Sequence, residues 1–473
     1  MTGAYRVPNL AIRNRVVVTN KTPSGLVRGF GGPQVYFALE RLMQKIAVTL
    51  GLDPLDMIRR NLVDRFPYRC PAGAVLDSGD YRAAVEQAVS EGRLDALRHR
   101  RDQARAAGRL YGIGYAAVVE PSISNMGYIT TVLSPEERQK AGPKGGAQAA
   151  ATVALDPLGG VSAVIDSLPQ GQGHRTVAAR IIADVFGVAA SAVRVEAALD
   201  TGRDAWSIAA GNYSSRFAGA TAGAAYLAAT RLKDKLARIA AAQLNLRPEE
   251  VRFADERVFA ATNPGNALNF MRLAGLGHWS PGSLPDLGPD GDAAPLRETV
   301  FWSPAALQPP NEADEINSSA AYGFVFDFCG VEIDRDTGEV CVDRYLSLHD
   351  AGRILHPALF DGQVRGAFAM AVGAAFYERF IYDESGSFLT GSFADYAVPR
   401  ADMVPDLLVL HRETLSPVTP LGAKGVAEGN SMSTPVCIAN AVADALGVSD
   451  IELPLTPPRI FQLLAAREHP SDA

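Results

Sequence analysis

The sequence has little cysteine and no long apolar run. Its four cysteines among 473 residues, Cys70, Cys329, Cys341 and Cys437, lie far apart and form no CxxC pair. An iron–sulfur cluster needs four neighbouring thiolates, so we do not expect one built from this chain alone. A disulfide scaffold is not expected in so large a chain. No stretch approaches the roughly 18–20 uninterrupted apolar residues of a membrane helix, so no membrane span is predicted.

Charge of one sign is not concentrated anywhere. The formal net charge is −7 and no block rich in Lys and Arg offsets it, so nucleic acid is not expected as a partner. The basic stretch Arg98–Arg105 is interrupted by Asp102 and is more typical of a solvated helix face than of a phosphate-binding strip. The first ten residues have neither the basic nor the apolar region of a signal peptide. We therefore predict a cytoplasmic protein.

The chain has instead the length and composition of a large globular protein. With 473 residues and 47% hydrophobic residues it can bury a sizeable core in two or three domains. Helical and strand patterns follow one another without an orderly βαβ series, which predicts the α+β class with mixed sheets and packed helices. We predict residues 1–70 as the end of one domain, 71–108 as a linker that contains a charged helix, and 109–473 as a second domain.

Local signals predict several elements of this fold. Helices are expected from Pro33 to Gly51, from Asp53 onward, near 81–106, up to Gly187, near 217–244 and near 359–378. Strands are expected near 150–155 and 161–167, in a hairpin around Asp336-Thr-Gly338, and as a pair near 380–390. The Pro-, Gly- and Asp-rich residues 280–315 predict an irregular segment.

Arg28, Gly29, Phe30 and Gly31 open the segment RGFGGPQ, just before a predicted helix. Glycines let a backbone approach a ligand closely, and the N–H groups at a helix start favour an anion. A tight strand-to-helix turn with Phe30 in the core fits the same spacing equally well.

The segment QGQGH repeats this arrangement with Gln170, Gly171, Gln172, Gly173 and His174. It is not the dinucleotide-binding fingerprint, because Thr176 replaces the third glycine. A lone GxG before a helix is weak evidence for phosphate binding, and an isolated histidine is more often structural than a ligand or a base.

A third segment, GNYSSRF, places Asn212, Ser214, Ser215 and Arg216 before the long helix. These residues could bind a phosphate. Capping of the helix by Ser214 or Ser215 is the more common explanation of such a pattern.

Lys424, Gly425 and Glu428 lie in the Gly/Ala-rich segment LGAKGVAEGNSMSTPV. Ser433 or Thr434 is then expected to cap a helix with Pro435 in its first turn. A carboxylate among small apolar neighbours is a candidate for a raised pKa, which suits a proton acceptor. Taken alone, an exposed loop glutamate explains the pattern more simply.

In this order, the four motifs resemble the second part of the molybdopterin-binding subunit of the xanthine dehydrogenase, aldehyde oxidase and aerobic carbon monoxide dehydrogenase family. Three further segments have the style of this family: HDAGR at His349–Arg353, GQVRG at Gly362–Gly366 and LTGSFADYA at Leu389–Ala397. The resemblance covers nearly the whole chain. It implies that residues 1–70 end a first molybdopterin-binding domain and that 109–473 form a second.

The resemblance also implies roles for the motif residues. Arg28 and Phe30 would line the molybdenum and substrate site, and the loops at 170–174 and 212–216 would hold the pterin and its phosphates, with a cytosine nucleotide in bacterial relatives. Gly29, Gly31, Lys424 and Gly425 are assigned to cofactor binding as well, and no residue is assigned as a metal ligand. Glu428 would be the general base when oxygen from water is added to an electron-poor carbon of an aromatic N-heterocycle or aldehyde.

Partner chains are implied by the same resemblance. Electrons would pass through a 2Fe–2S subunit to an FAD subunit, in a dimer of heteromers that acts on a small molecule. Ala427 departs from the family, which usually has glycine there, and Asn430–Thr434 replaces a more proline-rich run. The family's subunit also has a long first half, whereas 27 residues precede Arg28 here. Either another chain carries that half, or this chain is a truncated relic.

Two other functions are alternatives to that of an enzyme subunit. A non-catalytic subunit could keep the cofactor-binding fold for assembly or storage, but the presence of Glu428, Arg28 and both glycine loops favours the enzyme. A self-contained nucleotide-binding protein is disfavoured, because no complete phosphate-loop or Rossmann motif is present.

Overall fold

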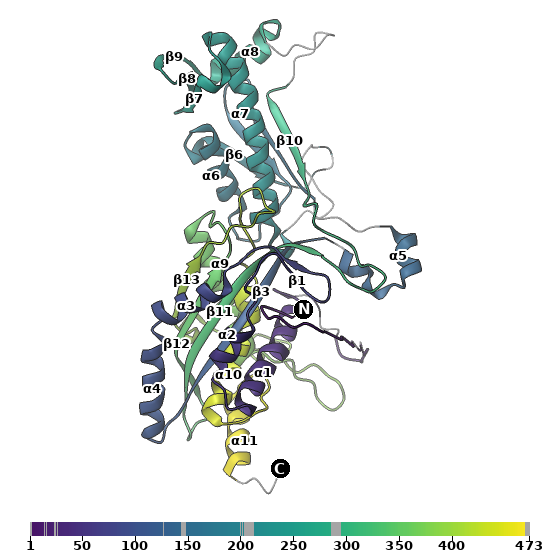
Figure 1. Ribbon diagram of the computed structural model, residues 1–473, viewed down its shortest axis with the longest axis vertical. Helices are drawn as coiled ribbons and strands as arrows, with labels where there is room; N and C mark the ends of the chain where they lie inside the picture. The colour runs from purple at the N-terminus through teal and green to yellow at the C-terminus, as the bar shows by residue number, and fades with distance from the viewer. Residues whose placement is uncertain are drawn as a thin grey trace. The chain divides into compact units, whose positions relative to one another are not determined.

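The computed structural model describes residues 2–13, 15, 17–22, 25, 27–125, 127–142, 148–198, 200, 202, 212–284 and 295–468. The chain forms two compact units, which are described separately (Figure 1). Unit 1 consists of Met1–Pro121, Ala321–Leu415 and Gly425–Ala473. Unit 2 consists of Ser122–Ala320 and Ser416–Lys424.

A four-stranded mixed sheet of order β13-β12-β11-β3 organises unit 1. Its strands are β3 (Leu110–Ser124), β11 (Ser319–Ile333), β12 (Val340–Asp350) and β13 (Leu407–Arg412). Strands β11 and β12 are antiparallel, whereas β12 and β13 are parallel. The hairpin predicted around Asp336-Thr-Gly338 is confirmed, and so is the α+β class with mixed sheets.

Helices cover both faces of this sheet. They are α1 (Gly32–Thr49), α2 (Pro54–Asn61), α3 (Tyr81–Glu91), α4 (Leu94–Ala106), α9 (Pro357–Phe376), α10 (Gly429–Leu446) and α11 (Pro457–Glu468). A small ribbon pairs β1 (Tyr68–Arg69) with β2 (Val75–Leu76). Figure 1 shows α3 and α4 on one side of the sheet and α1 and α10 on the other.

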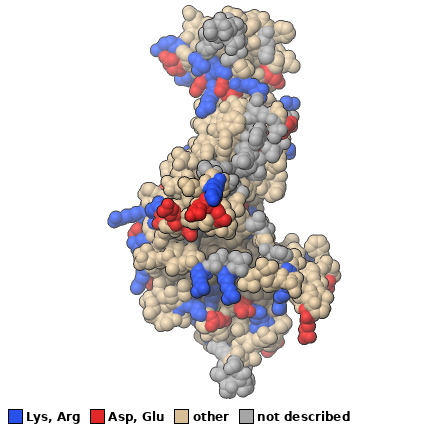
Figure 2. All heavy atoms as spheres, turned by 90° about the vertical axis from the view of Figure 1, so that its right-hand side faces the viewer, with Lys and Arg blue, Asp and Glu red and all other residues tan. Residues whose placement is uncertain are grey.

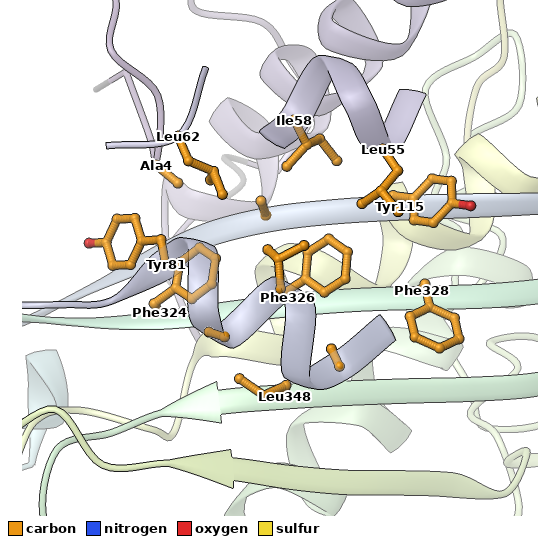
Figure 3. Close-up of a cluster of buried hydrophobic side chains, with 14 of the residues drawn as sticks. Ala4, Leu55, Ile58, Leu62, Tyr81, Tyr115, Phe324, Phe326, Phe328 and Leu348 are labelled. Atoms are coloured by element: carbon orange, nitrogen blue, oxygen red, sulfur yellow. The ribbon is translucent and has the colours of Figure 1, made fainter. Parts of the chain in front are cut away.

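One hydrophobic core lies between the sheet and helices α2, α3 and α4. The close-up in Figure 3 shows Leu55 and Ile58 of α2 directed towards aromatic side chains of the strands. The ring of Tyr81 stacks on that of Phe324, with centroids 4.2 Å apart. Buried side chains of β11 that face this core alternate with others that face the opposite side, as the two-residue period of a strand requires.

The second core lies on the opposite face of the sheet, under α9 and α10. At two positions the strand backbone itself contacts α10. A Cβ added to Gly112 would lie 2.1 Å from the carbonyl oxygen of Ala441, and one added to Gly114 would lie 2.0 Å from that of Cys437. These glycines therefore permit a close approach between β3 and α10.

Unit 2 contains a second four-stranded sheet, of order β10-β4-β5-β6. Its strands are β4 (Ala149–Leu155), β5 (Val161–Ile165), β6 (Val193–Ala197) and β10 (Arg297–Trp302). The helices are α5 (Pro135–Ala141), α6 (His174–Phe186), α7 (Ala222–Leu244) and α8 (Phe270–Trp279). A three-stranded sheet of β7 (Val251–Ala254), β8 (Arg257–Ala260) and β9 (Asn263–Asn269) completes the unit.

Three of the predicted elements were wrong in detail. The helix predicted near 81–106 is two helices, because Arg93 has a φ of +54° and the chain turns there. The segment predicted to be irregular contains β10, which pairs with β4, although residues 285–294 lie outside the described part. The predicted strand pair near 380–390 is reduced to one isolated bridge between Tyr382 and Phe388.

Residues 71–108, predicted as a linker, include β2, α3 and α4. Leu76, Val85 and Leu97 from this segment are buried in the same core as Leu55. The segment is therefore an integral part of unit 1. The family-domain boundaries themselves stay a prediction.

The basic stretch on α4 pairs with carboxylates. Arg98 contacts Asp53 at 2.8 Å, and Arg105 contacts Asp444 at 2.9 Å. On the face seen in Figure 2, basic and acidic side chains are interspersed. The solvated-face interpretation of this stretch is confirmed. Among the described helices, none combines the length and apolar character that a bilayer crossing requires.

Glu40 of α1 gives a testable dependence of stability on pH. Its Oε2 accepts hydrogen bonds from Tyr5 Oη (2.8 Å) and from the Ala117 amide (3.0 Å). Burial raises the pKa of Glu40 to about 8, although these hydrogen bonds act to lower it. Because the pKa of Glu40 is higher in the folded state, its stabilising contribution is complete below its unfolded-state pKa near 4.5. This contribution is lost as the pH rises towards 8.

We expect Glu40→Gln to remove this dependence, since an amide keeps the shape but does not ionise. Denaturant unfolding between pH 5 and 9 would then show a variant whose stability, relative to the wild type, increases with pH. Glu86→Gln, at an exposed carboxylate paired with Arg59, is the matched control. Parallel curves for wild type and Glu40→Gln would contradict a buried, titrating Glu40.

Candidate functional site

Glu428 is the N-cap residue of α10, and its side chain makes no capping hydrogen bond. This corrects the prediction that Ser433 or Thr434 caps the helix with Pro435 in its first turn: the helix begins at Gly429, and Pro435 lies inside it. Proline lacks an N–H and disfavours the preceding turn, which is why it indicated a helix start in the sequence. Side-chain contacts of the first turn with the sheet hold that turn helical.

Glu120 approaches Glu428 from the sheet. Glu120 lies on β3 and is 1% exposed. Its Oε1 accepts a hydrogen bond from the Glu428 amide at 3.2 Å. Glu120 was not among the site residues predicted from the sequence. The available signal was a lone carboxylate directly after the apolar run of β3, where a buried charge requires partners.

Arg28 and Glu428, predicted from separate motifs, are brought together in unit 1. The Arg28 Nε donates to the carbonyl oxygen of Ala427 at 2.5 Å, and Nη2 donates to that of Gln363 at 3.0 Å. Burial lowers the pKa of Arg28, and the charges of Glu428 and Glu120 act in the opposite direction. A cation thus lies beside two carboxylates, and it joins the glycine loop to the residue preceding Glu428.

The glycine loop itself passes against the first turn of α10. Gly29 and Gly31 have φ values of +76° and +78°, a conformation that favours glycine. A Cβ on Gly29 would be 3.4 Å from that of Glu428, whereas one on Gly31 would meet nothing within 4 Å. Phe30 is 43% exposed, so the alternative that places it in the core is wrong.

A buried polar network lies behind this turn. The Asp327 carboxylate accepts hydrogen bonds from Tyr345 (2.6 Å), Ser347 (2.5 Å), Ser433 (2.6 Å) and Asn430 (3.3 Å). Desolvation raises the pKa of Asp327 to about 6, against the effect of these donors. The sheet residues of the network are thereby linked to two residues of α10.

His349 belongs to the same network. Its Nε2 lies 2.9 Å from Asn430 Oδ1 and 2.9 Å from Ser347 Oγ. Because the Ser347 hydroxyl proton is directed to Asp327, the histidine must donate, so the proton is assigned to Nε2. Burial lowers the pKa of His349 to about 4, and the ring is therefore neutral at pH 7.

In unit 2, two of the predicted loops lie side by side. Asn212 Nδ2 donates to Gln170 Oε1 at 3.2 Å. Gly171 and Gly173 have φ values of +100° and +80°, and Gly173 is the N-cap residue of α6. A Cβ on Gly171 would meet nothing within 4 Å. This loop exposes backbone at the start of a 13-residue helix, an arrangement that suits an anionic group.

The segment before α7 has unusual backbone conformations. Ser214 and Ser215 have φ values of +57° and +42°, which L-residues rarely adopt. Ser214 Oγ accepts a hydrogen bond from the Ser124 amide at 3.0 Å. A π-helical turn, Phe217–Thr221, follows with Arg216 as its N-cap residue and no side-chain cap. The simple capping explanation of this motif is therefore wrong, and both features are enriched at functional sites.

Two predicted site residues of unit 2 have buried side chains. His174 stacks on Phe217, with ring centroids 3.9 Å apart, and its Nδ1 lies 3.0 Å from Ser167 Oγ. Burial lowers the pKa of His174 to about 4. Arg216 is 2% exposed and donates to the carbonyl oxygen of Gln148 at 2.8 Å. These two buried side chains contribute to the packing of the loops. Their part in cofactor binding stays a prediction.

Lys424 and Gly425 are both buried, at the boundary in sequence between the two units. Lys424 belongs to unit 2 and Gly425 to unit 1. A Cβ added to Gly323 of β11 would be 2.8 Å from the carbonyl oxygen of Gly425, so the chain passes close to the sheet there. The cofactor-binding role of both residues also stays a prediction.

Two parts of the chain match known protein families. Residues 87–405 match a molybdopterin cofactor-binding domain, and residues 1–62 match another domain of the same description. The first match covers more than half of the chain. The chain belongs to the molybdopterin cofactor-binding family. The predicted resemblance to the xanthine dehydrogenase, aldehyde oxidase and carbon monoxide dehydrogenase group is thereby confirmed.

Relatives of this molybdopterin-binding chain are large subunits of oxidoreductases. The nicotine 6-hydroxylase large subunit of Paenarthrobacter nicotinovorans is 30% identical over 464 residues, which are 98% of this chain and 53% of the relative. The carbon monoxide dehydrogenase large chain of Hydrogenophaga pseudoflava is 28% identical, over 99% of this chain and 55% of the relative. The chain therefore spans about half the length of these relatives.

A solved structure agrees with these matches. Quinoline 2-oxidoreductase from Pseudomonas putida 86 superposes with a TM-score of 0.80 at 30% identity, over 94% of this chain and 54% of that one. The fold of the molybdopterin-binding chain is thus that of a molybdenum hydroxylase subunit.

Proposed function

We propose that this chain is the catalytic part of the molybdenum subunit of a hydroxylase, with Glu428 as its general base. The observation that carries the proposal is the hydrogen bond of Arg28 to Ala427, which fixes the glycine loop beside Glu428. A cation, a glycine backbone and a carboxylate at a helix start are then available in one place. This set suits a reaction in which a proton leaves an attacking oxygen near a bound anionic cofactor.

The described residues fit molybdopterin. Gly31 precedes an 18-residue helix and Gly171 precedes a 13-residue one, and at both glycines a Cβ would meet nothing within 4 Å. Such backbone can approach a pterin or phosphate without a clash. We propose the loops at 170–174 and 212–216 as the phosphate-binding part, with a cytosine dinucleotide extension. When bound, the cofactor supplies a molybdenum centre that accepts two electrons.

In this proposal the chain's own residues hold the base in place and remove a proton from the attacking oxygen. Glu428 accepts a proton at its carboxylate, while its backbone amide is fixed by Glu120. Arg28 provides a positive charge beside that carboxylate, which counters the charge of two neighbouring acids. Phe30, with 43% of its surface exposed, offers an apolar face to a flat substrate.

We propose an aromatic N-heterocycle or an aldehyde as substrate, with water as the oxygen source. Support comes from the names of two relatives, which act on nicotine and quinoline. Both compounds contain a ring carbon next to nitrogen, which is electron-poor and open to attack by oxygen. Electrons would pass to a 2Fe–2S subunit and an FAD subunit, in a dimer of heteromers in the cytoplasm.

The test is to isolate the complex that contains this chain. Its molybdenum, iron, flavin and cytosine nucleotide content would be measured. Reduction of an artificial electron acceptor would then be followed with quinoline, nicotine and benzaldehyde. We expect stoichiometric molybdenum and turnover of at least one heterocycle or aldehyde. A complex without molybdenum, or one replete with molybdenum that oxidises none of the three, would instead favour the non-catalytic role.

A second prediction concerns the chain by itself. Apolar side chains on the outer face of α1 are exposed, including Leu42 (53%) and Ile46 (38%), and the relatives are about twice as long. We propose that sequence corresponding to their other half completes the cofactor site. The purified 473-residue chain should therefore hold far less than one molybdenum per chain, as measured by elemental analysis. A monodisperse, metal-replete chain with turnover would contradict this.

A further inference from the structure

We propose that Asp327, Ser347, His349 and Asn430 are positioning residues for Glu428. Their network fixes the first turn of α10 on the sheet and thereby sets the place of the carboxylate. This inference rests on the proposed role of Glu428 as base. In that proposal neither the cofactor nor the substrate contacts these four buried polar residues, and the inference gives them a function.

The network reaches from the sheet to within two residues of Glu428. Asp327 lies on β11, Ser347 and His349 lie on β12, and Asn430 is the second residue of α10. All four side chains are at most 1% exposed. Every step between them is a hydrogen bond of 3.3 Å or less. Displacement of Asn430 would therefore displace the turn that carries Glu428.

The amide of Asn430 has its orientation fixed by this surrounding. Its Oδ1 accepts from His349 Nε2, and its Nδ2 donates to Ser347 Oγ at 2.9 Å and to Asp327 at 3.3 Å. A flipped amide would place its oxygen against the Asp327 carboxylate and its nitrogen against the donating Nε2 of His349, so only one orientation satisfies the network. A fully satisfied buried network specifies one arrangement more strictly than apolar packing does.

Pro435 explains why the first turn of α10 needs a hydrogen-bond network to hold it. It lies inside α10 and cannot donate to the carbonyl of Ser431, so the helix ladder is weakened in its first turns. The Ser433 hydroxyl donates to Asp327 at 2.6 Å and also lies 3.2 Å from the Gly429 carbonyl oxygen, so it ties this part of the helix to the sheet. The position of Glu428 thus depends on side-chain contacts with the sheet more than on the helix itself.

Close packing adds to the same constraint. A Cβ on Gly429 would lie 2.7 Å from a methyl carbon of Val325, 3.1 Å from Glu120 Oε2 and 3.2 Å from His349 Cε1. The residue after Glu428 therefore rests directly on the network and on Glu120. No side chain separates the backbone of the catalytic turn from these groups.

The experiment is a double-mutant cycle in the assembled complex, combining Asn430→Ala with Glu428→Gln. It uses whichever of quinoline, nicotine or benzaldehyde reacts best. In the wild-type background we expect Asn430→Ala to lower kcat by about 10- to 100-fold, as misplacement of a catalytic group does, with KM changed less than threefold and molybdenum content near wild type. In the Glu428→Gln background the same change should have little further effect. Single-turnover reduction followed over hours makes the slow rates measurable.

Asn440→Ala is the matched control. This second buried asparagine of α10 donates to the Tyr115 carbonyl at 2.9 Å and accepts from Arg41, but it is ten residues further along the helix. It should lower the thermal midpoint about as much as Asn430→Ala while leaving kcat within twofold of wild type. If Asn430→Ala does not fold, Ser347→Ala takes its place, since it removes one hydroxyl of the network and leaves the asparagine.

The outcomes separate this inference from the proposed function. An equal loss of kcat from Asn430→Ala in both backgrounds would overturn positioning through Glu428 while leaving Glu428 as the base. Equal losses of kcat in Asn430→Ala and Asn440→Ala would overturn it too, because general destabilisation then explains the effect. Near-normal turnover of Glu428→Gln alone would refute the base itself.

Discussion

Replacing Glu428 by glutamine should lower turnover by about 10²- to 10⁴-fold, the usual contribution of a general base. The amide keeps the shape of the side chain at the N-cap of α10 and removes its ability to accept a proton. The backbone contacts of this turn, from the Glu428 amide to Glu120 and from Arg28 to Ala427, do not involve the altered atoms. Molybdenum content should therefore remain near that of the wild type, as elemental analysis of the complex would show.

Glu452→Gln serves as the control for this result. It makes the same chemical change in unit 1, at a carboxylate that is 81% exposed and paired with Arg459, and it should leave turnover unchanged. Near-normal turnover of a molybdenum-replete Glu428→Gln complex would exclude Glu428 as the base. Loss of molybdenum together with activity would show instead that Glu428 supports the site structurally.

The second large effect is expected from Gly114→Ala. A Cβ at this position would lie 2.0 Å from the Cys437 carbonyl oxygen and 2.5 Å from the Ala441 amide nitrogen. Both contacts are with helix backbone, which cannot rotate away as a side chain can. Since overpacking usually costs 1–3 kcal/mol and occasionally more, we expect a loss of about 3 kcal/mol or more in the free energy of unfolding. Urea denaturation followed by circular dichroism would measure it.

Gly362→Ala is the control for this substitution. Gly362 lies inside α9, and a Cβ there would meet nothing within 4 Å. Alanine favours a helix over glycine by about 1 kcal/mol, so this variant should be as stable as the wild type or more so. A Gly114→Ala chain of wild-type stability would mean that β3 and α10 can separate without cost.

The elements that the sequence predicted well have local signals at their ends. Asp53 caps α2 because its side chain accepts a hydrogen bond from the Leu55 amide, and Gly187 ends α6 with a φ of +67°. The start of α10 could not be predicted in this way. Pro435 is a local signal for a helix start, but long-range hydrogen bonds of Asn430 and Ser433 to Asp327 outweigh it.

The motifs of the candidate site were predicted from the sequence, but the contacts that hold these motifs in place were not. Arg28 and Ala427 are 399 positions apart, and only the family resemblance suggested that their motifs meet. Gln363 lies in a segment that the resemblance included, but its contact with Arg28 was not predicted, and the lone carboxylate of Glu120 after an apolar run was overlooked. Asp327 is the one acid in the apolar run YGFVFDFCGV, and a lone buried carboxylate of this kind would have been a usable signal for a polar network.

The division of the chain into units has a consequence for its biosynthesis. Nearly all of unit 2, Ser122–Ala320, is one continuous segment, whereas unit 1 is assembled from three segments. On the ribosome, unit 2 can fold once that segment has emerged. The packing of β3 against α10 must wait for more than 300 further residues, since Gly114 and Cys437 are 323 positions apart. Contacts of such long range form slowly. The turn that carries Glu428 can consequently be placed only after the main segment of unit 2 has been made, and a chain released before residue 425 lacks it altogether.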